Sequence, residues 1–214
     1  AVIVGNENYS DGADITEADA ALGAVGTLGA AGFTVTSGQD MQAPEVRGLL
    51  SPLMQAAPEE GRLVIVLSGH FAQAANDTWF LGVEASMPDL ATVDGVGVSL
   101  STVLEIAAQS SGGAVVLLGT EPRRLPLGPG LDAGIGAVAV PQGVTLVRGD
   151  AARVADFAAR VLPARGQSLA AMLDANPDLT ADGFLSALVP FRPANDAMAA
   201  DPLPGPDAEA VFYF

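Results

Sequence analysis

The residues of this chain that could do chemistry stand where strands of an α/β sheet are predicted to end. The only histidine, His70, closes the apolar run "LVIVLSGH" (63–70), and the run "AVVLLG" (114–119) leads into Thr120 and Glu121. A histidine exchanges a proton near neutral pH, and a carboxylate acts as a base or a ligand. The chain has no cysteine, which excludes a thiolate nucleophile, a disulfide and a thiolate metal site.

Short apolar runs alternate with longer helical patterns along the first 120 residues. The predicted strands are 1–5, 33–36, 62–69 and 114–119, with a short extended run at 79–85. The predicted helices are 16–32, 43–57 and 99–110, begun by Thr16, Pro44 and Ser99. Strands this continuously apolar indicate a parallel sheet covered by helices on both faces. In such a sheet a site is expected at the carboxyl ends of the strands.

The pattern loosens after residue 119. Two short strands are predicted, at 138–141 and 144–148. Three helices are predicted, at 150–162, 168–175 and 180–188, with Asp150 and Thr180 as N-caps of the first and third. Residues 193–207 are rich in proline and aspartate and indicate an irregular surface segment.

The acidic composition restricts the partners that the chain can have. Its net charge is −16, so no basic face is expected for a nucleic-acid backbone. All nine basic residues are arginine, a bias that indicates a bacterial source with a GC-rich genome. No apolar run has the length of a membrane span or a signal sequence, and no cofactor or metal motif is expected. The compartment, cytoplasmic or periplasmic, and the oligomeric state stay open.

Several motifs, in this order, resemble those of the caspase-like peptidases, and in particular of the bacterial metacaspases (orthocaspases). "AVIVGNENY" (1–9) resembles a strand that ends in Gly-Asn-x-x-Tyr, "LVIVLSGH" one that ends in Ser-Gly-His, and "AVVLLG" one that ends in Asp-x-Cys. The resemblance is clear over 1–120 and loose over 137–148. It implies an α/β, three-layer caspase-like sandwich for residues 1–192. Residues 193–214 are expected to be an irregular, proline-rich tail that leads toward a further region of a longer protein.

In that family the histidine and the cysteine form a dyad, in which the imidazole accepts the thiol proton and the thiolate attacks the peptide carbonyl. His70 matches the histidine. When "LLGTEP" is aligned without a gap, the cysteine position falls on Glu121. A carboxylate does not replace a thiolate in this chemistry, so the resemblance implies a degenerate member without its nucleophile.

The positions that bind the substrate in that family are partly retained in this chain. Asp19 matches an aspartate of the first helix that, in the metacaspase branch, helps to bind a basic side chain. The second aspartate of that pocket is replaced by Gly119, and Asp19 can equally bond loop backbone. Thr120 lies one position before Glu121, and Phe71 replaces the glycine after the family histidine, so its ring is expected where a substrate would approach.

Three functions follow from these residues. The first is a catalytically inactive caspase-like domain that binds a protein or peptide partner, or regulates, within a larger bacterial protein. The second is a residual or altered hydrolase that uses His70 with Thr120 or Glu121. The third is a structural assembly domain that acts through its acidic surface or a sheet edge. Only the second predicts a reaction rate that depends on His70.

Overall fold

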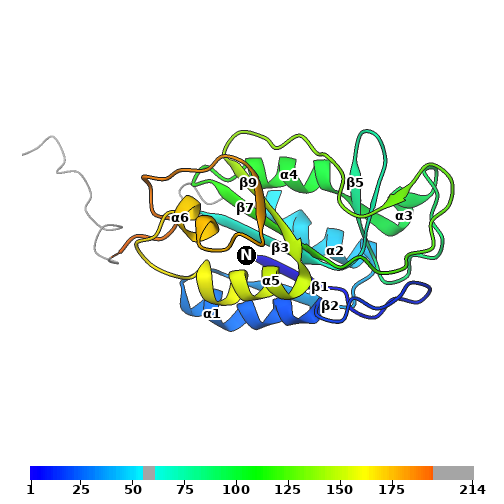
Figure 1. Ribbon diagram of the computed structural model, residues 1–214, viewed down its shortest axis with the longest axis horizontal. Helices are drawn as coiled ribbons and strands as arrows, with labels where there is room; N and C mark the ends of the chain where they lie inside the picture. Colours follow the sequence, from blue (N-terminus) through cyan, green and yellow to red (C-terminus); the bar gives the residue numbers. More distant parts are fainter. Residues whose placement is uncertain (55–60, 195–214) are drawn as a thin grey trace, which may run out of the picture.

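A computed structural model describes residues 1–54 and 61–194, and its centre is a six-stranded sheet (Figure 1). The strands, in spatial order, are β10 (Thr180–Gly183), β9 (Val144–Asp150), β7 (Ala114–Thr120), β3 (Leu63–Ser68), β1 (Val2–Gly5) and β2 (Thr36–Gln39). All neighbours are parallel except β10, which runs antiparallel to β9. The predicted mostly parallel sheet is therefore confirmed.

A smaller antiparallel sheet adjoins the carboxyl ends of the central strands. Its strands, in order, are β6 (Gly97–Ser99), β5 (Thr78–Leu81), β4 (Phe71–Gln73) and β8 (Asp132–Ala133). Because β3 ends at Ser68 and β4 begins at Phe71, His70 lies at the junction of the two sheets. Three of these strands have only two or three residues, too few for a periodicity to reveal them.

Helices cover both faces of the central sheet, which confirms the three-layer arrangement (Figure 1). On one face lie α2 (Ala43–Leu50), its 3₁₀ extension η2 (Ser51–Met54) and α4 (Leu100–Ala108). On the other face lie η1 (Asp19–Gly23), α1 (Ala24–Ala30), α5 (Ala151–Asp156), the π-helical turn η3 (Phe157–Val161) and α6 (Leu169–Asp174). The short α3 (Val93–Val96) precedes β6.

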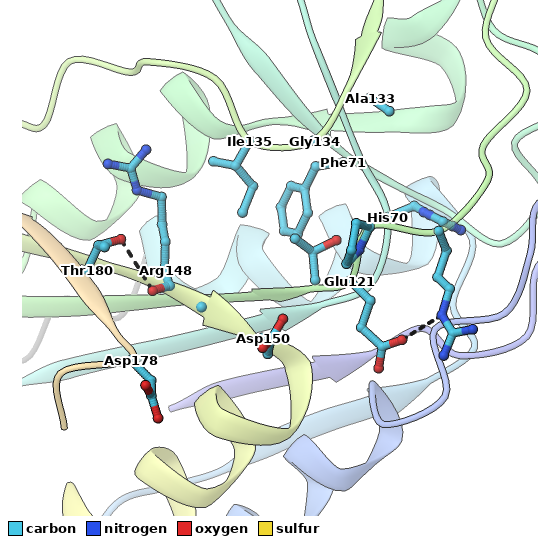
Figure 2. A pocket seen from close by; sticks show the side chains of 14 residues that line it. His70, Phe71, Glu121, Ala133, Gly134, Ile135, Arg148, Asp150, Asp178 and Thr180 are labelled. Atoms are coloured by element: carbon cyan, nitrogen blue, oxygen red, sulfur yellow. Dashed lines mark hydrogen bonds and ion pairs between the residues drawn. The ribbon is translucent and has the colours of Figure 1, made fainter.

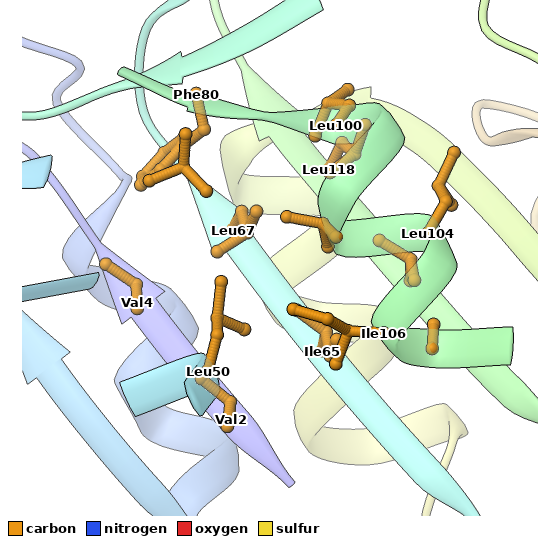
Figure 3. Close-up of a cluster of buried hydrophobic side chains, with 14 of the residues drawn as sticks. Val2, Val4, Leu50, Ile65, Leu67, Phe80, Leu100, Leu104, Ile106 and Leu118 are labelled. Atoms are coloured by element: carbon orange, nitrogen blue, oxygen red, sulfur yellow. The ribbon is translucent and has the colours of Figure 1, made fainter. Parts of the chain in front are cut away.

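In the four inner strands of the central sheet, β1, β3, β7 and β9, successive side chains point alternately into the two hydrophobic cores on opposite faces of the sheet. Ile65 and Leu67 of β3 pack with Leu104 of α4 and Leu118 of β7 on one face (Figure 3). Val64 and its alternate neighbours pack against α1 and α5 on the other. Burial of such a side chain contributes about 1.5–3 kcal/mol. Two buried faces explain why these strands read as continuous apolar runs.

Two predicted elements near the amino terminus are shifted. The strand predicted at 33–36 begins only at Thr36. Its hydrogen bonds to β1 can start only where β1 itself starts, and the first of them runs from the Thr36 N–H to the Ala1 carbonyl at 2.9 Å. The helix predicted at 16–32 is η1 followed by α1, and Thr16 is not its cap; Ala18 holds that position without a side-chain bond. Gly32, with φ of 95°, ends the helix as predicted.

The prediction of a helix at 180–188 is wrong. Residues 180–183 form β10 instead, because β9 would otherwise present an unpaired edge, a pairing that local periodicity does not encode. Gly183 has φ of 93°, and a Cβ there would collide with the Val144 carbonyl, so the position requires glycine. The strand predicted at 138–141 is also absent, whereas the one at 144–148 is confirmed as part of β9.

The remaining helix predictions hold in part. Ser99 caps α4, its Oγ accepting from the Thr102 N–H at 3.3 Å, as predicted. Pro44 lies in the first turn of α2, but α2 ends at Leu50, where the chain tightens into η2 around Pro52; positions 55–57 of that prediction lie outside the described residues. Asp150 occupies the N-cap of α5 without a side-chain bond.

Near the end of the described residues, the side chain of Phe191 packs into the hydrophobic core on the α1 and α5 face of the central sheet. Its ring is 4 % exposed, stacks on Phe33 with centroids 6.5 Å apart, and lies under the guanidinium of Arg62. Of the predicted tail at 193–214, positions 195–214 lie outside the described residues.

Candidate functional site

A pocket of 910 Å³ opens at the carboxyl ends of β3, β7 and β9 (Figure 2). Its lining includes His70, Phe71, Thr120 and Glu121, four of the residues singled out from the sequence. They come from segments 50 residues apart that the parallel ladder of β3 and β7 places side by side. The site lies where an open α/β sheet places its ligands.

His70 is held in one tautomer. Its Nε2 lies 2.6 Å from the carbonyl oxygen of Ala13, and since a carbonyl only accepts, Nε2 carries the proton. Its backbone N–H donates to the Tyr9 hydroxyl at 2.8 Å, and the two rings meet edge to face. Burial lowers the pKa of His70 below its ordinary value of 6.5, and the Ala13 carbonyl, Asp14 and Glu121 offset this only partly. The imidazole is thus neutral at pH 7, with Nδ1 as an acceptor.

Glu121 follows the last residue of β7 and is largely covered, with 16 % of its side chain exposed. Its Oε2 accepts from Nε of Arg123 at 2.8 Å. Arg123 also donates to the Thr16 hydroxyl at 3.3 Å. Arg123 is therefore the partner of Glu121, and it also lines the pocket.

Gly119 lies in β7, where it is buried, and it is not among the residues that line the pocket. A Cβ there would stand 2.8 Å from Ser68 Oγ and 3.0 Å from Cα of Ala151, so the strand accepts no larger residue without a shift. The Ser68 hydroxyl is buried, and among the described residues it has no hydrogen-bond partner. Thr120 is half-buried and pairs in register with Asp150 of β9.

Phe71 and Asp19 occupy different surroundings. The Phe71 ring is 1 % exposed and packs on Phe80 with centroids 5.3 Å apart, so most of it belongs to the core under the pocket. Asp19 opens η1 and is not among the residues that line the pocket. It lies beside Glu7, and burial together with the Asp19 carboxyl raises the pKa of Glu7.

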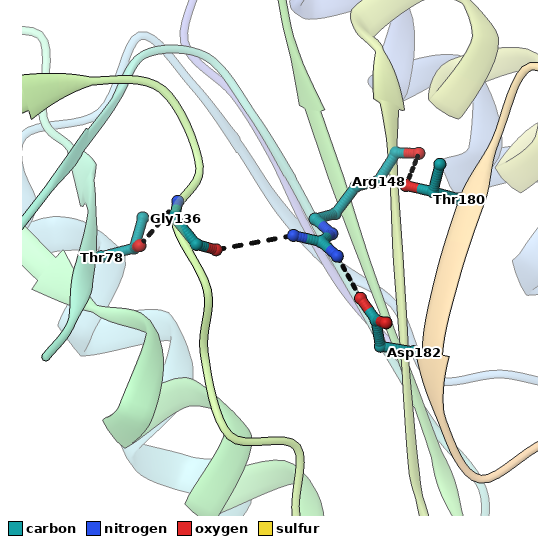
Figure 4. Close-up of polar contacts among 5 residues, drawn as sticks. All are labelled: Thr78, Gly136, Arg148, Thr180 and Asp182. Atoms are coloured by element: carbon teal, nitrogen blue, oxygen red, sulfur yellow. Dashed lines mark hydrogen bonds and ion pairs between the residues drawn. The ribbon is translucent and has the colours of Figure 1, made fainter. Parts of the chain in front are cut away.

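Sequence reasoning missed Arg148 and Asp150, which both line the pocket. Arg148 ties the pocket wall together (Figure 4): its guanidinium pairs with Asp182 of β10 and donates to the Gly136 carbonyl at 3.5 Å, while its own carbonyl accepts from Thr180. Both residues lie at the end of "VTLVRGD", the run that becomes β9. The rule that sites gather at strand ends would have found them had it been applied to this strand.

The comparisons with known proteins bear on the fold. No protein-family model and no curated protein sequence matches the chain. Among solved structures, the Drosophila initiator caspase Dronc superposes with a TM-score of 0.55 over 86% of this chain and 78% of that chain, at 9% sequence identity. The fold is caspase-like. At this identity the likeness concerns the path of the backbone and not the chemistry of the site.

The side chains that line the pocket supply hydrogen-bond acceptors and two arginines. Within residues 1–54 and 61–194, no group of three or more histidine, aspartate or glutamate side chains is placed to hold a metal ion, and no helix has the length and apolarity to cross a bilayer. Two hydroxyl side chains line the pocket, and that of Thr180 donates to the Arg148 carbonyl. The other belongs to Thr120, and within the described residues no hydrogen bond joins it to the imidazole of His70.

Proposed function

We propose that this chain is a degenerate relative of the bacterial metacaspases that has lost peptidase activity and binds a peptide segment of a partner protein in the His70 pocket. The observation that carries the proposal is Glu121, which stands at the end of β7 and is held in an ion pair with Arg123. A carboxylate in that state offers no acylating nucleophile, and the chain has no cysteine to replace it.

The neutral state of His70 supports the same proposal. In a nucleophile–base pair, the free nitrogen of the imidazole accepts the proton of the attacking group. Here Nδ1 is free to accept, but the charged group that acts on the ring from the family's nucleophile position is the carboxylate of Glu121. A carboxylate at pH 7 has no proton to give. The retained histidine then serves as a hydrogen-bond acceptor for a bound ligand.

The proposal includes the extent of the domain and the roles of the remaining residues. Residues 1–192 form the caspase-like domain. Thr120 and Phe71 line the peptide site, and Gly119, which is outside the pocket lining, allows the close packing of β7 against Ala151 of α5. Asp19, beside Glu7 and outside the pocket lining, keeps the sequence-based role of contacting a basic residue of the peptide at a second point.

Hydrolysis of a fluorogenic peptide library, with basic and acidic residues at the cleavage position and with or without calcium, tests the loss of activity. We expect the native chain and the His70→Ala variant to give the same background rate. Cleavage by the native chain that His70→Ala abolishes would overturn the proposal in favour of a hydrolase that uses Thr120. Thr120→Val, measured alongside, identifies that nucleophile.

A gain-of-function variant asks whether the rest of the site is built for catalysis. Glu121→Cys restores a thiol at the position that the family resemblance assigns to the nucleophile, and the neutral imidazole of His70, which lines the same pocket, can accept its proton. We expect slow hydrolysis that disappears in the His70→Ala, Glu121→Cys double variant. Iodoacetamide labelling provides an independent check that the new thiol is accessible. Its rate is expected to rise with pH, because the thiolate is the reactive form.

A further inference from the structure

A second large hollow lies at the opposite end of the central sheet from the His70 pocket, and we call it the amino-end hollow. It has a volume of 820 Å³ and is lined by the starts of β1 and β3, the turn that follows α1, and residues at the ends of α2, η2 and α4. It shares no lining residue with the His70 pocket. Large apolar side chains form much of its wall: Phe33, Leu49, Leu53, Leu63, Ile106 and Phe191. This wall continues into the core cluster of Figure 3, to which Ile106 belongs.

The charge of the amino-end hollow is opposite to that of the whole chain. The chain has 25 acidic and 9 basic residues, yet the charged side chains among the described lining residues are two arginines, Arg62 and Arg192, with no aspartate or glutamate. A smaller hollow of 270 Å³, also lined by Arg62 and Phe191, likewise has no carboxylate among its described lining residues. The apolar wall therefore carries positive charge, which complements an anion.

Neither arginine is neutralised by a carboxylate in the described parts of the chain. The guanidinium of Arg62 is half-buried 5.2 Å from the centroid of the Phe191 ring, and it makes no hydrogen bond or ion pair there. Burial lowers the pKa of Arg62, and no carboxylate offsets this effect. Arg192 donates to the carbonyls of Pro163 and Ala31 at 2.5 and 2.6 Å. Four other arginines each pair with a carboxylate, so acidic partners are common elsewhere in the fold.

We propose that the amino-end hollow binds a carboxylate with a single unbranched hydrocarbon chain, its head on Arg62 and its chain along the apolar wall. A carboxylate matches the planar guanidinium with two parallel hydrogen bonds, and it supplies the counterion that Arg62 lacks. A flexible chain can follow a wall that is built from separate segments, and each methylene that it buries adds to the affinity. The site is separate from the His70 pocket, so the inference goes beyond the proposed function.

Three small probes separate the contributions of the head and the chain. Octanoate is ionised at pH 7, octanamide has the same chain without the charge, and acetate has the charge without the chain. Each is titrated into the whole ¹⁵N-labelled chain, below the concentration at which octanoate forms micelles, and followed by amide chemical shifts. We expect octanoate to shift the amides of Phe33, Leu49, Arg62 and Phe191 and to leave that of Thr120 unchanged. Octanamide is expected to bind about tenfold more weakly, and acetate not to saturate.

The length of the chain provides a second readout. Decanoate has two more methylenes than octanoate and the same head. If the chain lies along the apolar wall, decanoate binds about tenfold more tightly at the same amides. Equal affinities of decanoate and octanoate would mean that the chain stays in water, which overturns the proposal.

A charge variant assigns the head to Arg62. Arg62→Gln is expected to weaken octanoate about tenfold and to leave octanamide unchanged. Arg160→Gln is the matched control, because it removes the same charge from an 80 % exposed side chain that does not line the hollow. Full affinity of octanoate for Arg62→Gln would overturn the assignment of the head.

A filling variant assigns the chain to the hollow. Gly48 is an exposed residue of α2 that lines the hollow, and no atom lies within 4 Å of a Cβ built on it. Gly48→Leu therefore adds bulk to the wall without a clash at Cβ, in a helix that favours leucine over glycine. We expect it to weaken octanoate at least severalfold. Gly26→Leu in α1, which is equally free of neighbours and outside the lining, is expected to change nothing.

The remaining outcomes name other occupants. Equal binding of octanoate and octanamide would mean that the hollow selects for apolarity alone, and it overturns a carboxylate site. The synthetic peptide DAEAVFYF, residues 207–214 of this chain, combines carboxylates with an apolar run. Its binding at the same amides without any binding of octanoate or decanoate would assign the hollow to a polypeptide and overturn the proposal. None of these results depends on whether the His70 pocket binds a peptide.

Discussion

At the scale of single residues, His70 is the group whose protonation the fold controls. The pKa of His70 is lower in the folded chain than in the unfolded chain, so between these two pKa values the imidazole is protonated when the chain is unfolded and neutral when it is folded. The stability due to the neutral ring is therefore complete above pH 6.5 and is lost as the pH falls from there through the folded pKa. We expect the free energy of unfolding to decrease over that window, and His70→Gln to remove this component.

Nuclear magnetic resonance checks the same point directly, because the chain has one histidine. The imidazole nitrogens of tag-free protein are expected to report the Nε2–H tautomer at pH 7 and a midpoint below 6.5. A midpoint above 6.5 would mean that the carboxylates around the ring outweigh its burial.

Tyr9 is the residue that fixes the His70 backbone. Its hydroxyl accepts from the His70 N–H at 2.8 Å and lies 3.3 Å from the Leu81 carbonyl, to which it donates. Tyr9→Phe keeps the buried ring but leaves the amide without an acceptor, which costs about 1–3 kcal/mol of stability. Urea unfolding of the two proteins measures this difference. A loss under about 0.5 kcal/mol, the range of ordinary surface changes, would show that water replaces the hydroxyl.

At the scale of elements, β1 is brought against η1 by a glycine. A Cβ at Gly5 would stand 2.5 Å from the Ala18 carbonyl and 2.9 Å from Cα of Asp19, both backbone atoms that cannot rotate away. We expect Gly5→Ala to destabilise the chain by about 1–3 kcal/mol. Gly26→Ala in α1 is the matched control, since no atom lies within 4 Å of its new methyl group. The control is expected to gain up to about 1 kcal/mol through helix propensity. Equal urea midpoints for the two variants would contradict the packing argument.

The elements also show where sequence reasoning succeeds. β3 and β7 have two buried faces, so their continuous apolar runs were predictable from the sequence, and so were the positions of His70 and Glu121 just beyond the strand ends. β10 was not, because what makes residues 180–183 a strand is the free edge of β9, a partner distant in sequence. The same limit hid the neighbouring positions of Glu121 and Asp150, which depend on the parallel register of β7 and β9.

At the scale of the whole molecule, the charge of −16 acts against the compact state. Specific ion pairs offset little of it. In the described chain there are four, and in each at least one side chain is 44 % exposed or more, which places them among the weak surface pairs. Self-repulsion among the acidic side chains is therefore the larger electrostatic effect on stability.

Salt should then stabilise this protein. Raising the ionic strength from about 0.01 M to about 0.15 M shortens the screening length from about 30 Å to about 8 Å, which weakens repulsion across the domain while leaving contacts at 3 to 4 Å less affected. We expect the urea midpoint at pH 7 to rise over this range and to level off above it. Choline chloride at equal ionic strength separates screening from binding of a particular cation. A midpoint that falls with salt would mean that the four ion pairs outweigh the net charge, and a rise specific to one cation would place a bound ion on the acidic surface.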